Sequence, residues 1–416
     1  MQRPGLNAGE TAVDALLHAS HLAAPHQLPA LVAEHARHVG ADDAVVYLAD
    51  LQQRVLVPFV GPEGPGDKDL EPLPIDATLA GRAYQHVEVL PQSLEAGAVR
   101  VWLPLLDGTQ RLGVLAATLA ASGPRPDDEP TRARLVRFAS LIAELIVTKT
   151  FYGDSIVRTR RRGEMGLAAE IQWSLLPPLT FACDQLVVAG ALEPAYEVAG
   201  DSVDYAVERD RTSFAVFDGM GHGLQSAQLA TISVAAYRNA RRAGRSLTAA
   251  AEAVEQAVLT AFGGEAFTTA VLAELDTDTG VLSWINVGHL EPLLLRDSHL
   301  VRRLSSEPDL PFGLGVAQGG QPSRTFAVSS EHLQRGDYVL LYTDGVVEAR
   351  SPSGELFGLD RLVDLITRNL AAELPPNETV RRTVRELLAH QQAQLRDDAT
   401  LLLLHWSGEV RDRLLP

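Results

Sequence analysis

Four aspartates stand where apolar, strand-like runs of this chain end or turn, and this pattern constrains the fold more than any other feature. The positions are Asp201 after residues 197–200, Asp218 after residues 214–217, Asp344 after residues 338–343 and Asp397 before residues 401–404. Short apolar runs bounded by turn residues predict β-strands. We expect the four aspartates to converge at one edge of a sandwich of two sheets.

Carboxylates gathered in one site repel each other and would become protonated unless cations keep them ionised. Oxygen ligands alone favour hard ions, so the pattern indicates Mg²⁺ or Mn²⁺ rather than zinc. Two such ions lower the pKa of a bridging water and neutralise charge on a transferred phosphoryl group. Gly219, directly after Asp218, is the best candidate for a main-chain carbonyl that approaches a metal, because glycine permits unusual backbone dihedrals.

An ordinary turn is the alternative for each aspartate taken alone. Asp-Gly pairs such as Asp218-Gly219 and Asp344-Gly345 are typical of turns after strands. Four aspartates in this order and context favour the metal site.

The composition is that of a soluble chain with more than one domain. A length of 416 residues exceeds what a single core usually supports, so we expect two domains and a connector. Hydrophobic residues make up 46% and charged residues 21% of the chain, the balance of a globular protein. The formal net charge of −17 repels phosphate backbones and anionic lipid, so we expect neither nucleic acid nor a membrane as a partner.

No apolar run approaches the ~18 to 20 residues that span a bilayer, and the first five residues lack a signal-peptide core. These features predict a cytoplasmic protein. The single cysteine, Cys183, excludes an internal disulfide and a cysteine-rich zinc site. We expect its side chain to be buried as a small hydrophobe.

The first domain, residues 11–150, mixes helix and strand. An amphipathic helix is predicted near residues 28–39, and strands near residues 44–48, 55–58, 101–105 and 112–117. This order, together with residues 78–83, resembles a GAF domain, which implies a sensor for an unknown small ligand. Five histidines in this part, His18, His21, His26, His35 and His38, are expected at the surface rather than in a metal cluster.

A segmented helical connector is predicted over residues 151–176. Ahead of it an apolar stripe at three-and-four spacing, Leu135, Phe138, Ile142 and Leu145, offers a face on which a partner helix packs. We therefore expect a homodimer through the connector. The basic run Arg158, Arg160, Arg161 and Arg162 fits either a solvated helix face or an acidic partner.

Residues 165–406 resemble the bacterial sporulation-type members of the metal-dependent protein phosphatase superfamily, the PPM or protein phosphatase 2C-like group. The matching stretches are residues 169–177, Gly200-Asp201 with Asp204, Asp218-Gly219 with residues 221–223, residues 286–289, residues 311–315, residues 342–346 with Glu348, and residues 396–400. The resemblance implies an α+β fold, in which an α-β-β-α sandwich of two antiparallel sheets fills residues 177–408 after the GAF-like α/β domain. Helices near residues 225–243, 246–262, 359–370 and 380–394, and a hairpin of residues 270–275 and 281–287, suit this fold.

The resemblance also implies a role for each site residue. Asp218 would bridge two Mn²⁺ or Mg²⁺ ions, Asp344 and Asp397 would hold one of them, and the Gly219 carbonyl the other. Asp201 would act on that second ion directly or through water. Asp398 would tune or orient Asp397.

This sequence departs from the family pattern at Ala199, which replaces a glycine, and at Ser202-Val203, which replace an aromatic pair. Substrate fit beside the first metal is therefore less defined than metal binding. His222 and His289 are open between a role as general acid or substrate contact and a role in holding their loops by hydrogen bonds.

Taken together, the sequence predicts a protein serine/threonine phosphatase that uses a metal-bridging hydroxide and is regulated by its GAF-like domain. Kinship implies that the substrate is a phosphorylated anti-sigma factor antagonist in a partner-switching pathway. The alternative is a catalytically silent regulatory module that senses a ligand and binds a signalling partner. Loss of a metal ligand would favour that alternative, and none of the expected ligands is missing.

Overall fold

The computed structural model describes residues 8–61, 70–193, 196, 200–315, 324–392 and 397–407. It divides into two compact units, the first ending at Gly163 and the second beginning at Glu164. Parts of the predicted motifs at residues 197–199 and Arg396, the end of the predicted helix at residues 393–394 and the predicted domain end at residue 408 lie outside the described residues.

The first unit is built on a six-stranded antiparallel sheet in the order β3-β2-β1-β6-β5-β4. Its strands are β1 (Asp43–Ala49), β2 (Val55–Phe59), β3 (Leu73–Pro74), β4 (Leu90–Ser93), β5 (Val99–Asp107) and β6 (Gln110–Leu119). Its helices are α1 (Ala8–Ser20), α2 (Leu28–His35), α3 (Leu79–His86), α4 (Glu129–Thr150) and α5 (Ser155–Arg160). Helices α1, α2 and α4 share one core with the sheet, and α3 shares a second core with it. Both faces of the sheet are therefore covered.

The apolar stripe of α4 packs inside the first unit. Leu135, Phe138 and Ile142 are fully buried in the core that also holds Val46 and Leu115 of the sheet. The expectation that a partner helix packs on this stripe is therefore wrong, because the stripe covers the chain's own sheet. Sequence periodicity shows that a face is apolar and says nothing of what covers it.

The segment that follows α4 is interrupted, as the sequence predicts. Helix α5 ends at Arg160, and α6 (Leu167–Leu175) begins after a non-helical stretch that contains Gly163. Ile156 of α5 belongs to the core of the first unit, whereas α6 lies in the second unit, where it contacts α7. The connector expected over residues 151–176 is therefore shared between the two units.

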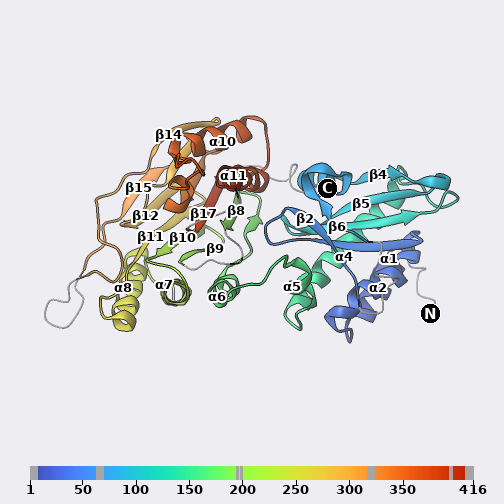
Figure 1. The fold of residues 1–416 in the computed structure, drawn as a ribbon, viewed down its shortest axis with the longest axis horizontal. Coiled ribbons are helices and arrows are strands. Elements are labelled where there is room, and N and C mark those ends of the chain that lie inside the picture. Colours follow the sequence, from blue (N-terminus) through green and yellow to red (C-terminus); the bar gives the residue numbers. More distant parts are fainter. Residues whose placement is uncertain are drawn as a thin grey trace. The chain divides into compact units, whose positions relative to one another are not determined.

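The second unit contains two antiparallel sheets (Figure 1). One has the order β15-β12-β11-β10-β9 and the other β14-β13-β16-β17-β8-β7. The strands are β7 (Thr180–Ala182), β8 (Leu186–Glu193), β9 (Asp201–Val207), β10 (Arg211–Gly219), β11 (Thr268–Asp276), β12 (Val281–Val287), β13 (Leu293–Arg296), β14 (His299–Arg303), β15 (Ser329–His332), β16 (Tyr338–Tyr342) and β17 (Ala399–Trp406). Besides α6, the helices are α7 (Leu224–Arg242), α8 (Leu247–Phe262), α9 (Asp344–Val347), α10 (Leu359–Ala371) and α11 (Pro376–His390).

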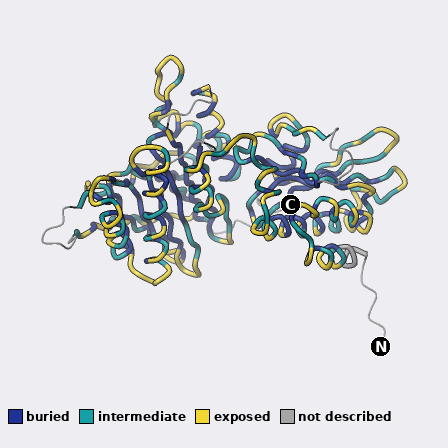
Figure 2. Tube along the Cα trace, turned by 60° about the horizontal axis from the view of Figure 1, so that its bottom comes forward, coloured by how far each residue is buried: buried dark blue, intermediate teal, exposed yellow. Residues whose placement is uncertain are grey.

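Three cores show that this unit is a four-layer sandwich. One core lies between the sheets and includes Val216 and Leu402. A second joins the β10-β11 sheet to α7 and α8, and a third joins the β16-β17 sheet to α10 and α11. Figure 2 shows the strands of this unit largely buried and the helices exposed along their outer faces. The predicted α-β-β-α arrangement, the four helices and the β11-β12 hairpin are confirmed.

Two smaller findings concern the Cys183 side chain and the helices of the described residues. Cys183 is exposed, so the expectation of a buried cysteine is wrong; it lies in the turn between β7 and β8, where side chains face solvent. In the described part of the chain, no helix is long and apolar enough to cross a membrane.

Candidate active site

The predicted aspartates meet at one edge of the sandwich, and both sheets contribute to it. Asp201 begins β9 and lies opposite Asp218 on β10. Asp344 begins α9 directly after β16, and Asp397 precedes β17, the strand paired with β16. The convergence expected from the strand-end pattern is present.

Hydrogen bonds between the sheets hold this edge together. The Asp398 carboxylate accepts from the backbone N–H of Gly200 at 2.7 Å and from that of Asp201 at 3.1 Å. The Thr343 hydroxyl donates to Asp201 Oδ2 at 2.7 Å and accepts from Thr400 N at 2.9 Å. Side chains of the β16-β17 sheet therefore position Asp201 of the other sheet.

Glycine is required where the backbones approach most closely. A Cβ at Gly200 would lie 2.4 Å from the Gly219 carbonyl oxygen, and a Cβ at Gly345 would lie 1.9 Å from the Asp398 carbonyl oxygen. These backbones have no room for a side chain. The Gly219 amide in turn donates to the Gly200 carbonyl at 3.0 Å.

Exposure increases across the four aspartates. Asp201 is 2% exposed, Asp218 and Asp344 are half-buried, and Asp397 is exposed. The Asp201 carboxylate is therefore buried within this edge of the sandwich, whereas the carboxylates of Asp218, Asp344 and Asp397 are more exposed to solvent.

The electrostatics of the cluster are unfavourable without a cation. Burial and the neighbouring Asp344, Asp397 and Asp398 raise the pKa of Asp218 to about 7. Burial and Asp397 also raise the pKa of Asp344, and burial with Asp218 raises that of Asp201 well above its usual value. In the part of the chain that the structure describes, no lysine or arginine forms an ion pair with Asp218, Asp344 or Asp397.

The chemistry of this donor set suits hard divalent cations, which would supply the positive charge that the protein lacks here. Among the described residues, no group of three or more His, Cys, Asp and Glu side chains is arranged to hold a metal ion. The fit therefore rests on the uncompensated carboxylates of Asp218, Asp344 and Asp397.

His222 and His289, whose roles the sequence leaves open, differ in their surroundings. His289 Nδ1 lies 2.8 Å from the Thr269 hydroxyl, and Nε2 lies 3.1 Å from the Tyr342 carbonyl oxygen. Its backbone also binds the Asn286 side chain. These contacts give His289 a structural role, whereas His222 is exposed beside the site.

We expect His289 to make stability depend on pH. Burial lowers its pKa to about 4, so below pH ~6.5 the unfolded chain takes up a proton that the folded chain refuses. The free energy of unfolding should fall by about 1–2 kcal/mol between pH 7 and pH 5 through this group. Urea unfolding in EDTA would measure this as a larger fall for wild type than for His289→Gln. Parallel pH profiles would contradict the assignment.

Sequence reasoning missed three supporting side chains. The Thr268 hydroxyl donates to the Asp218 carbonyl at 2.9 Å, Gln172 Nε2 donates to the Asp201 carbonyl, and Thr343 binds the Asp201 carboxylate. Gln172 and Thr343 lie in quoted motifs, but nothing in their spacing indicated these partners. Asp398 is expected to tune or orient Asp397, and its backbone amide donates to Asp397 Oδ1 at 2.9 Å. Its carboxylate instead binds the backbone amides of Gly200 and Asp201.

Part of the second unit is similar to a known protein family. Residues 208–407 match the family model of stage II sporulation protein E (SpoIIE). The match lies within the second unit and covers just under half of the chain. The matched segment holds Asp218, Asp344 and Asp397, while Asp201 lies seven residues ahead of it.

Individual relatives match parts of the chain. Protein IcfG of Synechocystis sp. is 32% identical over 140 residues, which cover 33% of this chain and 20% of IcfG. The phosphoserine phosphatase RsbU of Bacillus subtilis is 24% identical over 243 residues, which cover 58% of this chain and 70% of RsbU. The solved SiaA-PP2C domain of Pseudomonas aeruginosa is 22% identical, with a TM-score of 0.47, over 58% of this chain and 94% of that domain. The chain thus spans only a fifth of IcfG.

Proposed function

We propose that this chain is a metal-dependent protein serine/threonine phosphatase. The observation that carries the proposal is the set of carboxylates Asp218, Asp344 and Asp397, gathered at a glycine-lined edge where no lysine or arginine of the described residues forms an ion pair with them. The match to the SpoIIE family model and the similarity to the phosphoserine phosphatase RsbU support the same activity.

Each residue has a part in the proposed reaction. Asp218 would be shared between two Mn²⁺ or Mg²⁺ ions, Asp344 and Asp397 would hold one of them, and the Gly219 carbonyl would hold the other. The Asp201 carboxylate accepts a hydrogen bond from the Thr343 hydroxyl, and the Asp201 backbone amide donates to the Asp398 carboxylate. In the proposed reaction Asp201 acts on the second ion from the buried side of the site. Bound cations would supply positive charge for the phosphoryl oxygens and a water of lowered pKa.

The proposed substrate is a phosphorylated anti-sigma factor antagonist in a partner-switching pathway. This follows from the family resemblance, and the name of RsbU supports a phosphoserine substrate. Nucleic acid does not suit this chain as a partner, because the chain carries a formal charge of −17.

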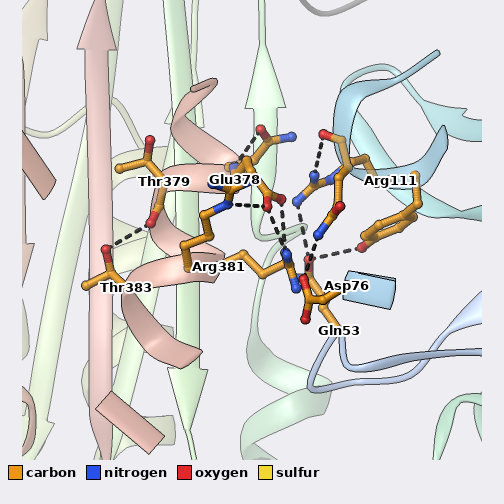
Figure 3. A network of polar contacts seen from close by, with 11 residues as sticks. Gln53, Asp76, Arg111, Glu378, Thr379, Arg381 and Thr383 are labelled. Carbon is orange, nitrogen blue, oxygen red and sulfur yellow. Dashed lines mark hydrogen bonds and ion pairs between the residues drawn. The ribbon is translucent and has the colours of Figure 1, made fainter. Parts of the chain in front are cut away.

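We also propose that the first unit is a GAF-like sensor that regulates the phosphatase. Its sheet, with helices on both faces, supports this, as does a polar cluster beside α3 (Figure 3). Arg111 donates to the Gln85 carbonyl at 3.1 Å, and its guanidinium lies over the Tyr84 ring. Gln85 in turn donates to Asp76 at 2.6 Å. An arginine among such partners suits recognition of a polar ligand.

The proposed homodimer is confined to the connector, since the α4 stripe is used within the first unit. Phe151 and Tyr152, at the start of the connector, are 83% and 77% exposed. Two large exposed aromatic side chains in sequence suit a contact between copies.

Phosphate release from a phosphoserine peptide and from p-nitrophenyl phosphate tests the proposed activity. The whole chain would be assayed with Mn²⁺, with Mg²⁺ and with EDTA. We expect turnover with either metal and none with EDTA. A folded protein that binds Mn²⁺ but releases no phosphate from either substrate would favour the alternative, a silent module that binds a signalling partner.

A further inference from the structure

Strand β9, which begins with Asp201, is tied to α6 and to the chain just after it at three points. Near its start, Gln172 of α6 donates through Nε2 to the Asp201 carbonyl. Farther along, the Tyr205 hydroxyl donates to the Pro178 carbonyl at 2.7 Å. Between these, Asp204 is linked to the end of α6 through an arginine of α7.

Asp204 is a buried charge with two arginine partners. The residue is 1% exposed, and its carboxylate accepts from Arg238 at 2.7 Å and from Arg241 at 2.9 Å. Removing a carboxylate from water is costly unless it is paired and hydrogen-bonded. The two guanidinium groups meet that requirement together.

The two arginines differ in one respect. Arg238 also donates through Nη2 to the Leu175 carbonyl at 2.6 Å, whereas Arg241 donates to Asp204 and lies over the Tyr237 ring. Leu175 is the last residue of α6, and the last carbonyls of a helix have no partner within it. Arg238 therefore joins the end of α6 to β9.

The distance from this junction to the site is short. Asp204 lies three residues after Asp201 on the same strand, and Asp201 pairs with Asp218 on β10. A shift of α6 would move β9 through Arg238 at one point and through Gln172 at another. Such a movement would strain the bonds that the Asp201 carboxylate and amide make to Thr343 and Asp398.

We propose that Arg238 is a positioning residue that sets the place of Asp201, and thereby the metal affinity of the site, by clamping the end of α6 to β9. The inference rests on the proposed function, because it takes Asp201 to act on a bound cation. Arg241 supplies charge to the same carboxylate without forming the clamp.

Arg238→Lys tests the clamp, with Arg241→Lys as its matched control. A lysine at either position keeps a positive charge for Asp204, but a single ammonium group at position 238 lacks the fork that reaches both Asp204 and the Leu175 carbonyl. Mn²⁺ binding would be measured by calorimetry on the full chain, and Mn²⁺ activation by phosphate release. We expect Arg238→Lys to weaken Mn²⁺ binding about tenfold, as for loss of one hydrogen bond from a charged donor. At saturating Mn²⁺ its kcat should stay within about twofold of wild type.

The Arg241→Lys control distinguishes a positioning role of Arg238 from a general effect on stability. Arg241→Lys should bind Mn²⁺ like wild type, and a tenfold loss in both variants, or in neither, would overturn the proposal. If Arg238→Lys does not fold, Gln172→Met tests the same α6–β9 junction without touching the ion pair, and unchanged Mn²⁺ binding there would also overturn it. Failure of the wild-type chain to bind Mn²⁺ would instead contradict the proposed function.

Discussion

Asp218→Asn is expected to reduce metal-dependent phosphate release by about 10³-fold or more without reducing stability. Asparagine keeps the size of the side chain but lacks the second anionic oxygen needed to bridge two cations. In EDTA the same change removes a charge that lies among Asp344, Asp397 and Asp398. The melting temperature in EDTA should therefore rise, by about 2–4 °C.

The direction of the expected change in stability follows from the pKa of the Asp218 carboxyl group. The pKa of Asp218 is raised to about 7 in the folded protein, so above that pH the folded state carries a carboxylate it disfavours, and stability without metal falls as pH rises toward 7. The test compares calorimetric melting and phosphate release at pH 8 for wild type, Asp218→Asn and the surface control Asp364→Asn. Lower stability of Asp218→Asn in EDTA, or retained activity, would refute the assignment.

Gly345→Ala is expected to lower the free energy of unfolding of the second unit by about 3 kcal/mol. The new methyl group would overlap the Asp398 carbonyl oxygen, which is backbone and cannot rotate away. Relief requires α9 and the start of β17 to separate, which would also displace Asp344 and Asp397. We therefore expect phosphate release to fall as well.

Gly163→Ala is the matched control, since a Cβ there meets nothing within 4 Å. Differential scanning calorimetry of both variants in EDTA measures the effect on each transition of the chain. A melting temperature for Gly345→Ala equal to that of Gly163→Ala would show that the two backbones do not approach this closely in solution.

The location of the site was predictable because it depends on local signals. Each of the four aspartates lies at or near a strand terminus, and strands of a sandwich bring their termini to common edges. Asp201, Asp218, Asp344 and Asp397 could therefore be located without knowledge of the topology. Helices α7 and α8 were predicted within one or two residues, because alanine-rich apolar periodicity sets them apart from the flanking strands.

The sequence did not predict which other parts of the chain pack against a given helix face or side chain. The stripe of Leu135, Phe138 and Ile142 suits an intermolecular helix pair as well as it suits the sheet it packs against. Cys183 carries no local sign of exposure. The link from Arg238 to Asp204 and Leu175 joins positions 34 and 63 residues apart, and no periodicity in a single sequence reports such a pair.

The place of β17 has a consequence for how the domain is made. This last strand lies between β16 and β8, so β8 joins its sheet only through a segment that the ribosome adds at the end of the domain. Asp398, which anchors the Gly200-Asp201 backbone nearly 200 residues earlier, arrives with it. Contacts of such long sequence separation form late in folding. During synthesis, a chain that still lacks β17 therefore exposes one unpaired edge of β8, and the candidate site is incomplete until β17 and Asp398 have emerged.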